Sequence, residues 1–169
     1  MKKLVLLLIA ILVPALLTAQ IPNSNHVVVV LEENESYSAV TGSSSMPYLN
    51  SLASQNALAT QYYANTHPSI GNYFMLTAGE IITNNDSLNT TVNVDNIVRH
   101  LLSAGKTWKS YAESLPSVGY IGGDQYPYIR HHNPLSYFTD VANSSVQRLN
   151  LVPFTHFSAD LANLSLIHI

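Results

Sequence analysis

The fold of this chain is decided by one stretch, His67-Pro68-Ser69-Ile70-Gly71-Asn72-Tyr73-Phe74-Met75-Leu76-Thr77-Ala78-Gly79. From Ile70 onward the apolar residues recur every three or four positions, which is the spacing of one buried helix face. A residue before proline avoids the helical conformation, and glycine commonly ends a helix. The stretch therefore predicts a helix that begins near Ser69 and ends at Gly79.

Two interpretations of Ser69 are open at this point. Serine is a common residue at a helix N-terminus because its oxygen accepts a free backbone N–H, so Ser69 can have this structural role alone. A helix N-terminus also attracts anions. A phosphate there would place Ser69 near phosphorus and the Asn72 amide, one turn on, near a phosphoryl oxygen. Serine is a weak nucleophile, so the second interpretation needs a base or a metal ion nearby.

The composition is that of a globular protein with one core. The chain has 169 residues, of which 47% are hydrophobic and 10% are charged, with a formal net charge of −3. This length is enough to bury one core. The sequence has no basic patch, so we expect no nucleic-acid partner. It has no cysteine, which is ordinary for a bacterial periplasmic enzyme with a proper core.

The first 19 residues have the pattern of a secretory signal peptide. Lys2 and Lys3 precede an apolar run over residues 4–17, and small residues follow at Thr18 and Ala19. A membrane anchor is the alternative, but the run is short for a bilayer and contains Pro14. We therefore expect cleavage near Ala19, a secreted or periplasmic protein, and no stable insertion in a membrane.

Strands and helices are predicted to alternate along the rest of the chain. Strands are predicted over residues 26–31, 57–64 and 106–112, and the first is β-branched without alternation, as in a strand covered on both faces. Helices are predicted from Pro47, from Ser69, between an Asp95 N-cap and Gly105, and over residues 135–141 and 157–164. Alternation of this kind is typical of α/β proteins with a largely parallel sheet.

Two short segments carry candidate site residues. Glu33 and Asn34 follow the first predicted strand and offer hard oxygen ligands suited to a divalent cation, although a solvated turn is the alternative. His131 and His132 precede Asn133-Pro134 and can be a general acid, phosphate ligands or ordinary loop residues. Their spacing is not that of a helical zinc site. Asp86 lies in a polar region without a motif.

Taken in order, these segments resemble a known family of enzymes. The match consists of the strand followed by Glu33-Asn34, the segments 46–53 and 56–64, the stretch 67–73, and His131-His132-Asn133-Pro134. It is similar to the phosphoesterase family of bacterial acid phosphatases and phospholipases C, within the alkaline-phosphatase-like superfamily. The resemblance implies a three-layer α/β/α sandwich with a largely parallel central sheet.

The resemblance also implies roles for individual residues. Glu33 and Asn34 match a metal-ligating pair, and Ser69 matches the nucleophile, whose oxygen also binds the metal. Asn72 matches an asparagine that contacts a phosphoryl oxygen. His132 matches a phosphate contact or proton donor. A divalent metal ion of unknown identity is the implied cofactor, and a phosphate ester is the implied substrate.

The chain departs from the family pattern near its end. Family members carry a further acidic cluster with a histidine that completes the metal site, and the sequence has no such cluster. We therefore expect residues 20–163 to be an incomplete catalytic domain, truncated at the C-terminus, and residues 164–169 to be a non-native tail. On this expectation the 169-residue chain alone binds metal poorly and is inactive.

The sequence thus predicts an exported, metal-dependent phosphoesterase that forms a phosphoseryl intermediate. Two alternatives stay open: a phospholipase-C-like phosphodiesterase, and a non-catalytic secreted α/β binding module. All of these depend on one spatial expectation, that Glu33 and Ser69 face a common site.

Overall fold

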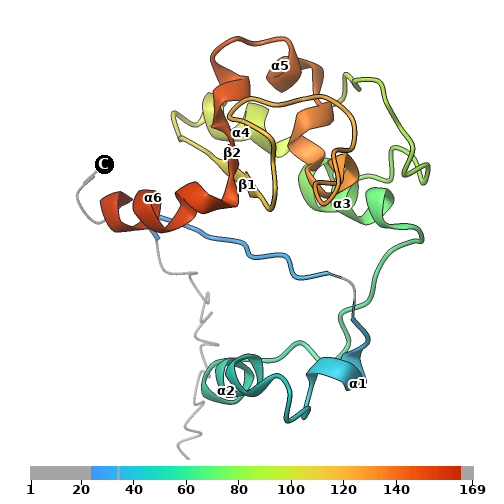
Figure 1. Cartoon of the computed structure of the whole chain (residues 1–169), viewed down its shortest axis with the longest axis vertical. Helices are drawn as coiled ribbons and strands as arrows, with labels where there is room; N and C mark the ends of the chain where they lie inside the picture. Colours follow the sequence, from blue (N-terminus) through green and yellow to red (C-terminus); the bar gives the residue numbers. More distant parts are fainter. Residues whose placement is uncertain (1–23, 34, 165–169) are drawn as a thin grey trace, which may run out of the picture. The chain divides into compact units, whose positions relative to one another are not determined.

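The structure, a computed structural model, describes residues 24–33 and 35–164 of the chain. The chain divides between Glu32 and Glu33 into two units, each described here by itself. Figure 1 follows the chain from its N-terminal to its C-terminal part. The predicted signal peptide and residues 165–169 of the predicted tail lie outside the described residues.

Residues 24–32 contain no helix or strand, so the strand predicted over residues 26–31 is wrong. The apolar side chains of this run are exposed, with Val27 at 80% and Val29 at 79%. A strand covered on both faces must pair its N–H and C=O groups with neighbouring strands. Within the described part of the chain, no ladder or bridge includes these residues. The β-branched composition alone does not produce a strand.

The strand predicted over residues 57–64 is also wrong. These residues include a turn and no strand, and Leu58, Tyr62 and Tyr63 are exposed. Strand propensity reflects packing on a half-buried surface, and the exposed side chains of this segment have no such surface.

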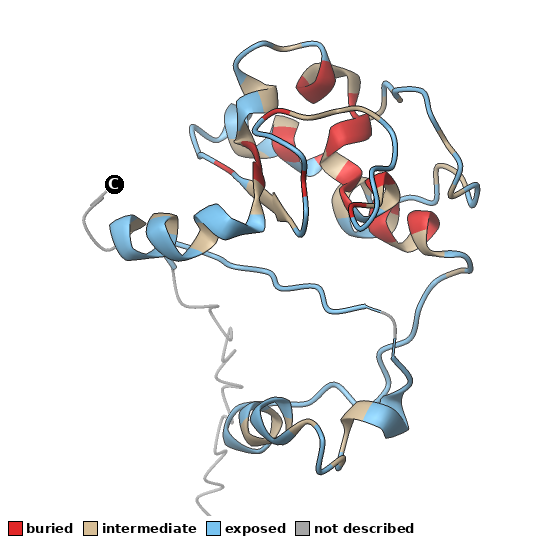
Figure 2. Cartoon of the chain, viewed as in Figure 1, coloured by how far each residue is buried: buried red, intermediate tan, exposed pale blue. Residues whose placement is uncertain are grey.

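Among the described residues before residue 56 there are two helices, α1 (Tyr37–Val40) and α2 (Pro47–Gln55), and neither buries a residue. Pro47 occupies the first turn of α2, as predicted, because its fixed φ suits that position. Asn50 connects the two helices: its Nδ2 donates to the Val40 carbonyl at 2.8 Å, and its Oδ1 accepts the Gly42 N–H at 2.6 Å. Figure 2 shows both helices in the colours of exposed and intermediate residues.

Helix α3 (Ser69–Ala78) is the helix predicted from the opening stretch. Gly79 follows it with φ of 76°, a left-handed conformation that glycine adopts without strain. The Phe74 side chain is fully buried, and its ring centre lies 5.7 Å from that of Tyr137 and 6.0 Å from that of Phe138. The helix therefore places Ser69 at the edge of the core, five residues before its most buried aromatic residue.

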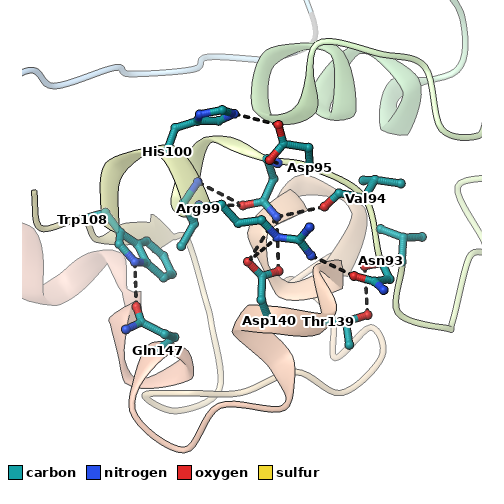
Figure 3. A network of polar contacts seen from close by, with 12 residues as sticks. Asn93, Val94, Asp95, Arg99, His100, Trp108, Thr139, Asp140 and Gln147 are labelled. Atoms are coloured by element: carbon teal, nitrogen blue, oxygen red, sulfur yellow. Dashed lines mark hydrogen bonds and ion pairs between the residues drawn. The ribbon is translucent and has the colours of Figure 1, made fainter. Parts of the chain in front are cut away.

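Helix α4 (Ile97–Ser103) begins with a different cap from the predicted Asp95. The Asn96 side chain accepts N–H groups of the first turn and is only 2% exposed as a residue. Asp95 instead pairs with exposed His100 at 2.7 Å. Figure 3 shows this pair and the ion pair between Arg99 and Asp140, in which Nε and Oδ2 are 3.1 Å apart. Burial beside Asp140 favours the neutral asparagine over the aspartate as the cap.

The described residues form one sheet of two parallel strands, β1 (Ser110–Ala112) and β2 (Leu151–Pro153), with Tyr111 opposite Val152. Strand β1 lies at the end of the third predicted strand. Helices together with a small parallel sheet agree with the α/β class. The three-layer sandwich stays a prediction.

Short helical turns connect the two strands and follow them. These are η1 (Arg130–His132), η2 (Pro134–Tyr137), α5 (Thr139–Ala142), η3 (Gln147–Asn150), η4 (Phe154–His156) and α6 (Phe157–Leu164). The helix predicted over residues 135–141 is divided into η2 and α5, whereas α6 has the predicted bounds. The tail predicted over residues 164–169 begins at Leu164, which is the last residue of α6.

The core lies between α3, α4, η2, α5 and the sheet. It consists of apolar and aromatic residues, namely Ile70, Phe74, Val98, Trp108, Leu115, Tyr128, Tyr137, Phe138, Val141 and Leu151. Within residues 24–33 and 35–164, no helix is both long enough and apolar enough to cross a membrane.

Candidate active site

The Ser69 hydroxyl and the Glu33 carboxylate are in direct contact. Ser69 is the first residue of α3, and its Oγ donates a hydrogen bond to Glu33 Oε1 at 2.6 Å. The two side chains come from positions 36 residues apart. The expectation that they share one site therefore agrees with the structure, although residues 26–31 form no strand.

The second oxygen of the same carboxylate has two further partners. The Tyr73 hydroxyl donates to Glu33 Oε2, and His132 Nε2 lies 3.0 Å from the same atom. The Glu33 side chain is 23% exposed, so its charge is only partly solvated. Hydrogen bonds to a charged acceptor are stronger than neutral ones. One carboxylate therefore gathers a serine, a tyrosine and a histidine.

Tyr73 joins the site because of its position on the helix. It follows Ser69 by four residues, one turn of an α-helix, so both hydroxyl groups lie on one helix face. Burial raises the pKa of Tyr73 above its usual range, and the hydrogen bond to Glu33 raises it further. The phenol therefore stays a hydrogen-bond donor at neutral pH. The apolar spacing from Ile70 places Tyr73 on the buried face of the helix and gives no sign of a role in the site.

The histidine pair is carried by the turn η1. The two rings meet edge to face with centres 4.4 Å apart, and the His132 ring lies 5.6 Å from the Tyr73 ring. Partial burial lowers the pKa of His132, and the Glu33 charge opposes part of this change. His132 thus contacts Glu33, and the His131 ring lies against the His132 ring.

Arg130 fixes the start of that turn. This residue is only 6% exposed, its guanidinium lies 4.2 Å from the ring centre of Tyr137, and it donates to the carbonyl of Ser136 at 3.2 Å. Its backbone N–H donates to Asp124 Oδ1 at 2.8 Å. A buried cation held by an aromatic face and carbonyl groups keeps the two histidines in place.

Asp86 reaches the same helix end from the polar loop between α3 and α4. Its Oδ1 accepts the Ile70 backbone N–H at 2.9 Å, and its Oδ2 lies 3.9 Å from His131 Nε2. A carboxylate at a helix N-terminus interacts favourably with the free N–H groups and the helix dipole. Sequence reasoning missed this residue, because no motif surrounds Asp86.

Asn72 makes contacts that the sequence did not predict. Its Oδ1 accepts the backbone N–H groups of Asn65 at 2.8 Å and Thr66 at 3.1 Å, and its Nδ2 donates to the Thr66 carbonyl at 2.7 Å. These bonds hold the turn before Ser69. The expected contact of Asn72 with a phosphoryl oxygen stays a prediction. Asn34, the other expected metal ligand, lies outside the described residues.

The donor set can be compared with what a divalent cation requires. The Glu33 carboxylate and the Ser69 hydroxyl are hard oxygen donors in contact, which suits a hard cation such as Mg²⁺ or Ca²⁺. In the part of the chain that the structure describes, no group of three or more histidine, aspartate or glutamate residues is arranged to hold a metal ion. The residues present therefore fit part of a cation site.

The comparisons with known proteins agree with the resemblance. The model of the phosphoesterase family matches residues 42–166, a range that contains Ser69, Asn72 and His132 and begins after Glu33 and Asn34. The chain is 38% identical over 144 residues to a phosphatidylinositol-3-phosphatase of Mycobacterium tuberculosis, which covers 84% of this chain and 46% of the relative.

Fungal proteins are also similar. The chain is 35% identical over 126 residues to a phosphate-repressible acid phosphatase of Penicillium chrysogenum, which covers 70% of this chain and 30% of that protein. It is 34% identical over 143 residues to an acid phosphatase of Aspergillus fumigatus, and this match covers 79% of this chain and 31% of that protein. No solved structure matches the chain.

The chain thus spans less than half the length of these curated relatives. The family model nevertheless covers most of the 169 residues, including the helix that carries Ser69 and the turn that carries His132. The chain belongs to the phosphoesterase family.

Proposed function

We propose that this protein hydrolyses phosphate esters in the manner of an acid phosphatase, with Ser69 as its nucleophile. One observation carries the proposal: the Ser69 hydroxyl, at the first turn of α3, donates to the Glu33 carboxylate at 2.6 Å beside His132. A serine needs such a partner to become a nucleophile. The names of the relatives, among them acid phosphatases, support the same class of reaction.

The reaction proceeds in two displacements. Ser69 Oγ forms a bond to phosphorus while the bond from phosphorus to the ester oxygen breaks, and the leaving alcohol keeps that electron pair. Glu33 Oε1 accepts the serine proton, or water accepts it when a cation occupies the carboxylate, and His132 or water protonates the leaving oxygen. A water oxygen then forms a bond to phosphorus while the bond from phosphorus to Ser69 Oγ breaks. The attacking water loses a proton and Ser69 Oγ gains one, by way of Glu33, His132 or solvent, so phosphate is released and the Ser69 hydroxyl is restored. Asn72 and the start of α3 are proposed to meet the phosphoryl oxygens.

A divalent cation is part of the proposal, with Glu33, Asn34 and Ser69 as its ligands. When bound, the cation would favour the ionised serine and offset negative charge on the phosphoryl oxygens. Glu33 and Ser69 already lie in contact, so both oxygens can bind one ion after the hydroxyl proton is lost.

The substrate is proposed to be a phosphomonoester. The printed name of the Mycobacterium tuberculosis relative makes a phosphoinositide one candidate. A phosphodiester, as cleaved by a phospholipase-C-like enzyme, is the alternative, and a binding module without activity is the third outcome. The sequence of residues 1–19 supports export, with Gln20 as the first residue of the exported protein.

The test compares variants in a phosphatase assay with a divalent metal present. Substrates are p-nitrophenyl phosphate, a short-chain phosphatidylinositol 3-phosphate and bis-p-nitrophenyl phosphate. Because the chain spans 46% of the first relative, the assay uses both the 169-residue chain and the protein encoded by the complete reading frame. The variant is Ser69→Ala. The matched control is Ser158→Ala, an exposed serine in the first turn of α6.

We expect Ser69→Ala to lower kcat by about a thousandfold or more, because the nucleophile is lost, while Ser158→Ala has no effect. Full turnover in the Ser69→Ala variant would refute the nucleophile. Turnover of the diester alone would favour the phosphodiesterase, and no turnover in any parent protein would favour the binding module. Removal of metal with a chelator is expected to abolish activity, and re-addition to restore it.

A further inference from the structure

Helix α3 holds both oxygens of the Glu33 carboxylate. Ser69 donates to Oε1 and Tyr73 donates to Oε2, and these two donors are one helical turn apart on a single face. A carboxylate held at both oxygens has a defined orientation, whereas one held at a single oxygen can rotate. The second hydroxyl therefore adds orientation and not merely another contact.

The two hydroxyl groups differ in how firmly they are fixed. Tyr73 is only 8% exposed, precedes fully buried Phe74, and has its ring beside that of His132. Glu33 follows residues 24–32, which are all exposed and form neither helix nor strand. The position of the carboxylate next to Ser69 is therefore set by side-chain hydrogen bonds, and the donor with the most rigid surroundings is Tyr73.

We propose that Tyr73 is a positioning residue, whose hydroxyl holds the Glu33 carboxylate against the Ser69 hydroxyl and beside His132. Without that hydroxyl, Oε2 keeps only His132, whose side chain is 42% exposed, so the carboxylate is held less firmly against Ser69. The importance of this arrangement for catalysis rests on the proposed function. The arrangement itself can be tested without metal or substrate.

The test is a double-mutant cycle read by NMR on the metal-free 169-residue chain. The variants are Tyr73→Phe, Glu33→Ala and the double variant, and the signal is the chemical shift of Ser69. Phenylalanine keeps the buried ring, so the contact with Phe74 and the core is retained. The matched control is Tyr63→Phe, since the Tyr63 side chain is 75% exposed.

If Tyr73 acts through Glu33, Tyr73→Phe shifts the Ser69 resonances in the direction that Glu33→Ala does. In the Glu33→Ala background, Tyr73→Phe then adds nothing. A role in packing alone would move Ser69 equally in both backgrounds. Unchanged Ser69 resonances in Tyr73→Phe, or equal shifts with and without Glu33, would overturn the proposal.

A second measurement covers the case in which Tyr73→Phe does not fold. In the wild-type chain, a buried hydroxyl that donates to a carboxylate exchanges slowly with water, so the Tyr73 hydroxyl proton is expected to give a signal at low temperature. Glu33→Ala is expected to remove this signal, and its persistence would contradict the contact. In a catalytically active protein, Tyr73→Phe is expected to lower kcat about tenfold with a smaller change in KM.

The two proposals fail in different ways. Turnover that survives Ser69→Ala refutes the phosphatase mechanism and leaves the NMR cycle unaffected. A positive cycle with unchanged kcat would show that Tyr73 orients Glu33 without consequence for catalysis, which overturns the catalytic part of the inference.

Discussion

Residues 24–69 and residues 70–153 have similar apolar runs but opposite burial. Every residue from 24 to 33 and from 35 to 69 is exposed or half-buried, whereas the core residues all lie between Ile70 and Val152. Figure 2 shows this as red segments that are confined to the later part of the chain. This difference in burial distinguishes helix ends, which depend on residues nearby in the sequence, from strands, which depend on residues far away in the sequence.

Local features form in both regions. Pro47 begins α2 in the exposed region, and Gly79 ends α3 in the buried one. Among the described residues, strands form in the second region alone, where β1 (ending at Ala112) and β2 (beginning at Leu151) pair in parallel. A helix satisfies its own backbone groups, but a strand depends on a partner. Two regions of one chain therefore differ most in their strands.

The largest expected effect comes from truncating a core aromatic residue. Phe74 is fully buried beside Tyr137 and Phe138, so Phe74→Ala is expected to lower the free energy of unfolding by about 3–5 kcal/mol. The matched variant in the exposed region is Leu52→Ala in α2, whose side chain is 40% exposed. It is expected to cost about 0.5 kcal/mol or less. Urea unfolding measures the free energy of unfolding of both variants. Equal losses of stability would show that the two regions do not differ in this respect.

A smaller effect is expected where the loop after α3 touches the helix. A Cβ atom at Gly71 would lie 2.2 Å from Asn84 Oδ1 and 2.5 Å from Thr66 Cγ2. Gly71→Ala is therefore expected to cost about 1–3 kcal/mol through overpacking, although alanine favours the helix. Gly123 has no atom within 4 Å of such a Cβ, so Gly123→Ala is the control. Thermal unfolding measures the stability of each variant. If Gly71→Ala is at least as stable as the wild type, the loop that contains Asn84 can move away from the helix.

The smallest expected effect is a change in stability that is seen only in alkaline solution and that comes from the buried Tyr137. Burial raises the pKa of Tyr137 to about 12 from its usual 10.0, so the folded state holds this proton more tightly than the unfolded state. Its contribution to stability is complete below pH 10 and is lost as the pH rises through about 12. We expect Tyr137→Phe to lose less stability than the wild type over this interval.

The control for the alkaline measurement lies in the exposed region. Tyr48 in α2 is 72% exposed, so Tyr48→Phe is expected to leave the pH dependence of unfolding unchanged. Unfolding by urea at pH 9, 10, 11 and 12 gives both curves. A Tyr137→Phe curve that coincides with the wild-type curve would mean that Tyr137 does not contribute to the alkaline loss of stability.

The helices were predictable because their signals are local. The spacing from Ile70, the proline at 47 and the glycine at 79 each act within one or two turns. The cap of α4 shows the limit of this reasoning, since Asp95 and Asn96 are both good capping residues. The choice of Asn96 depends on its burial beside Asp140, which lies 44 residues away. The strands over residues 26–31 and 57–64 failed for the same reason, because composition does not supply a partner.

The candidate site was predictable where residue chemistry and the family resemblance pointed to the same pair. Glu33 and Ser69 lie in contact as expected. Tyr73 could have been found from its spacing of one turn after Ser69, but an aromatic residue on an apolar helix face gives no signal of a second role. Asp86 could not have been found, because its contact with Ile70 depends on the path of an irregular loop. The residue types alone also could not show that Asn72 binds the backbone of residues 65 and 66.

The bond between Asp86 and the Ile70 N–H has a consequence for protein engineering. The segment from 80 to 93 is an attractive target for loop exchange, because its sequence is polar and mostly free of regular structure. Yet Asp86 Oδ1 in this segment accepts a hydrogen bond from the first turn of α3. A grafted loop that keeps an acidic residue at the equivalent position retains this hydrogen bond. One that lacks it also changes the surroundings of Ser69, the proposed nucleophile, so a screen of loop variants over this segment should hold position 86 constant.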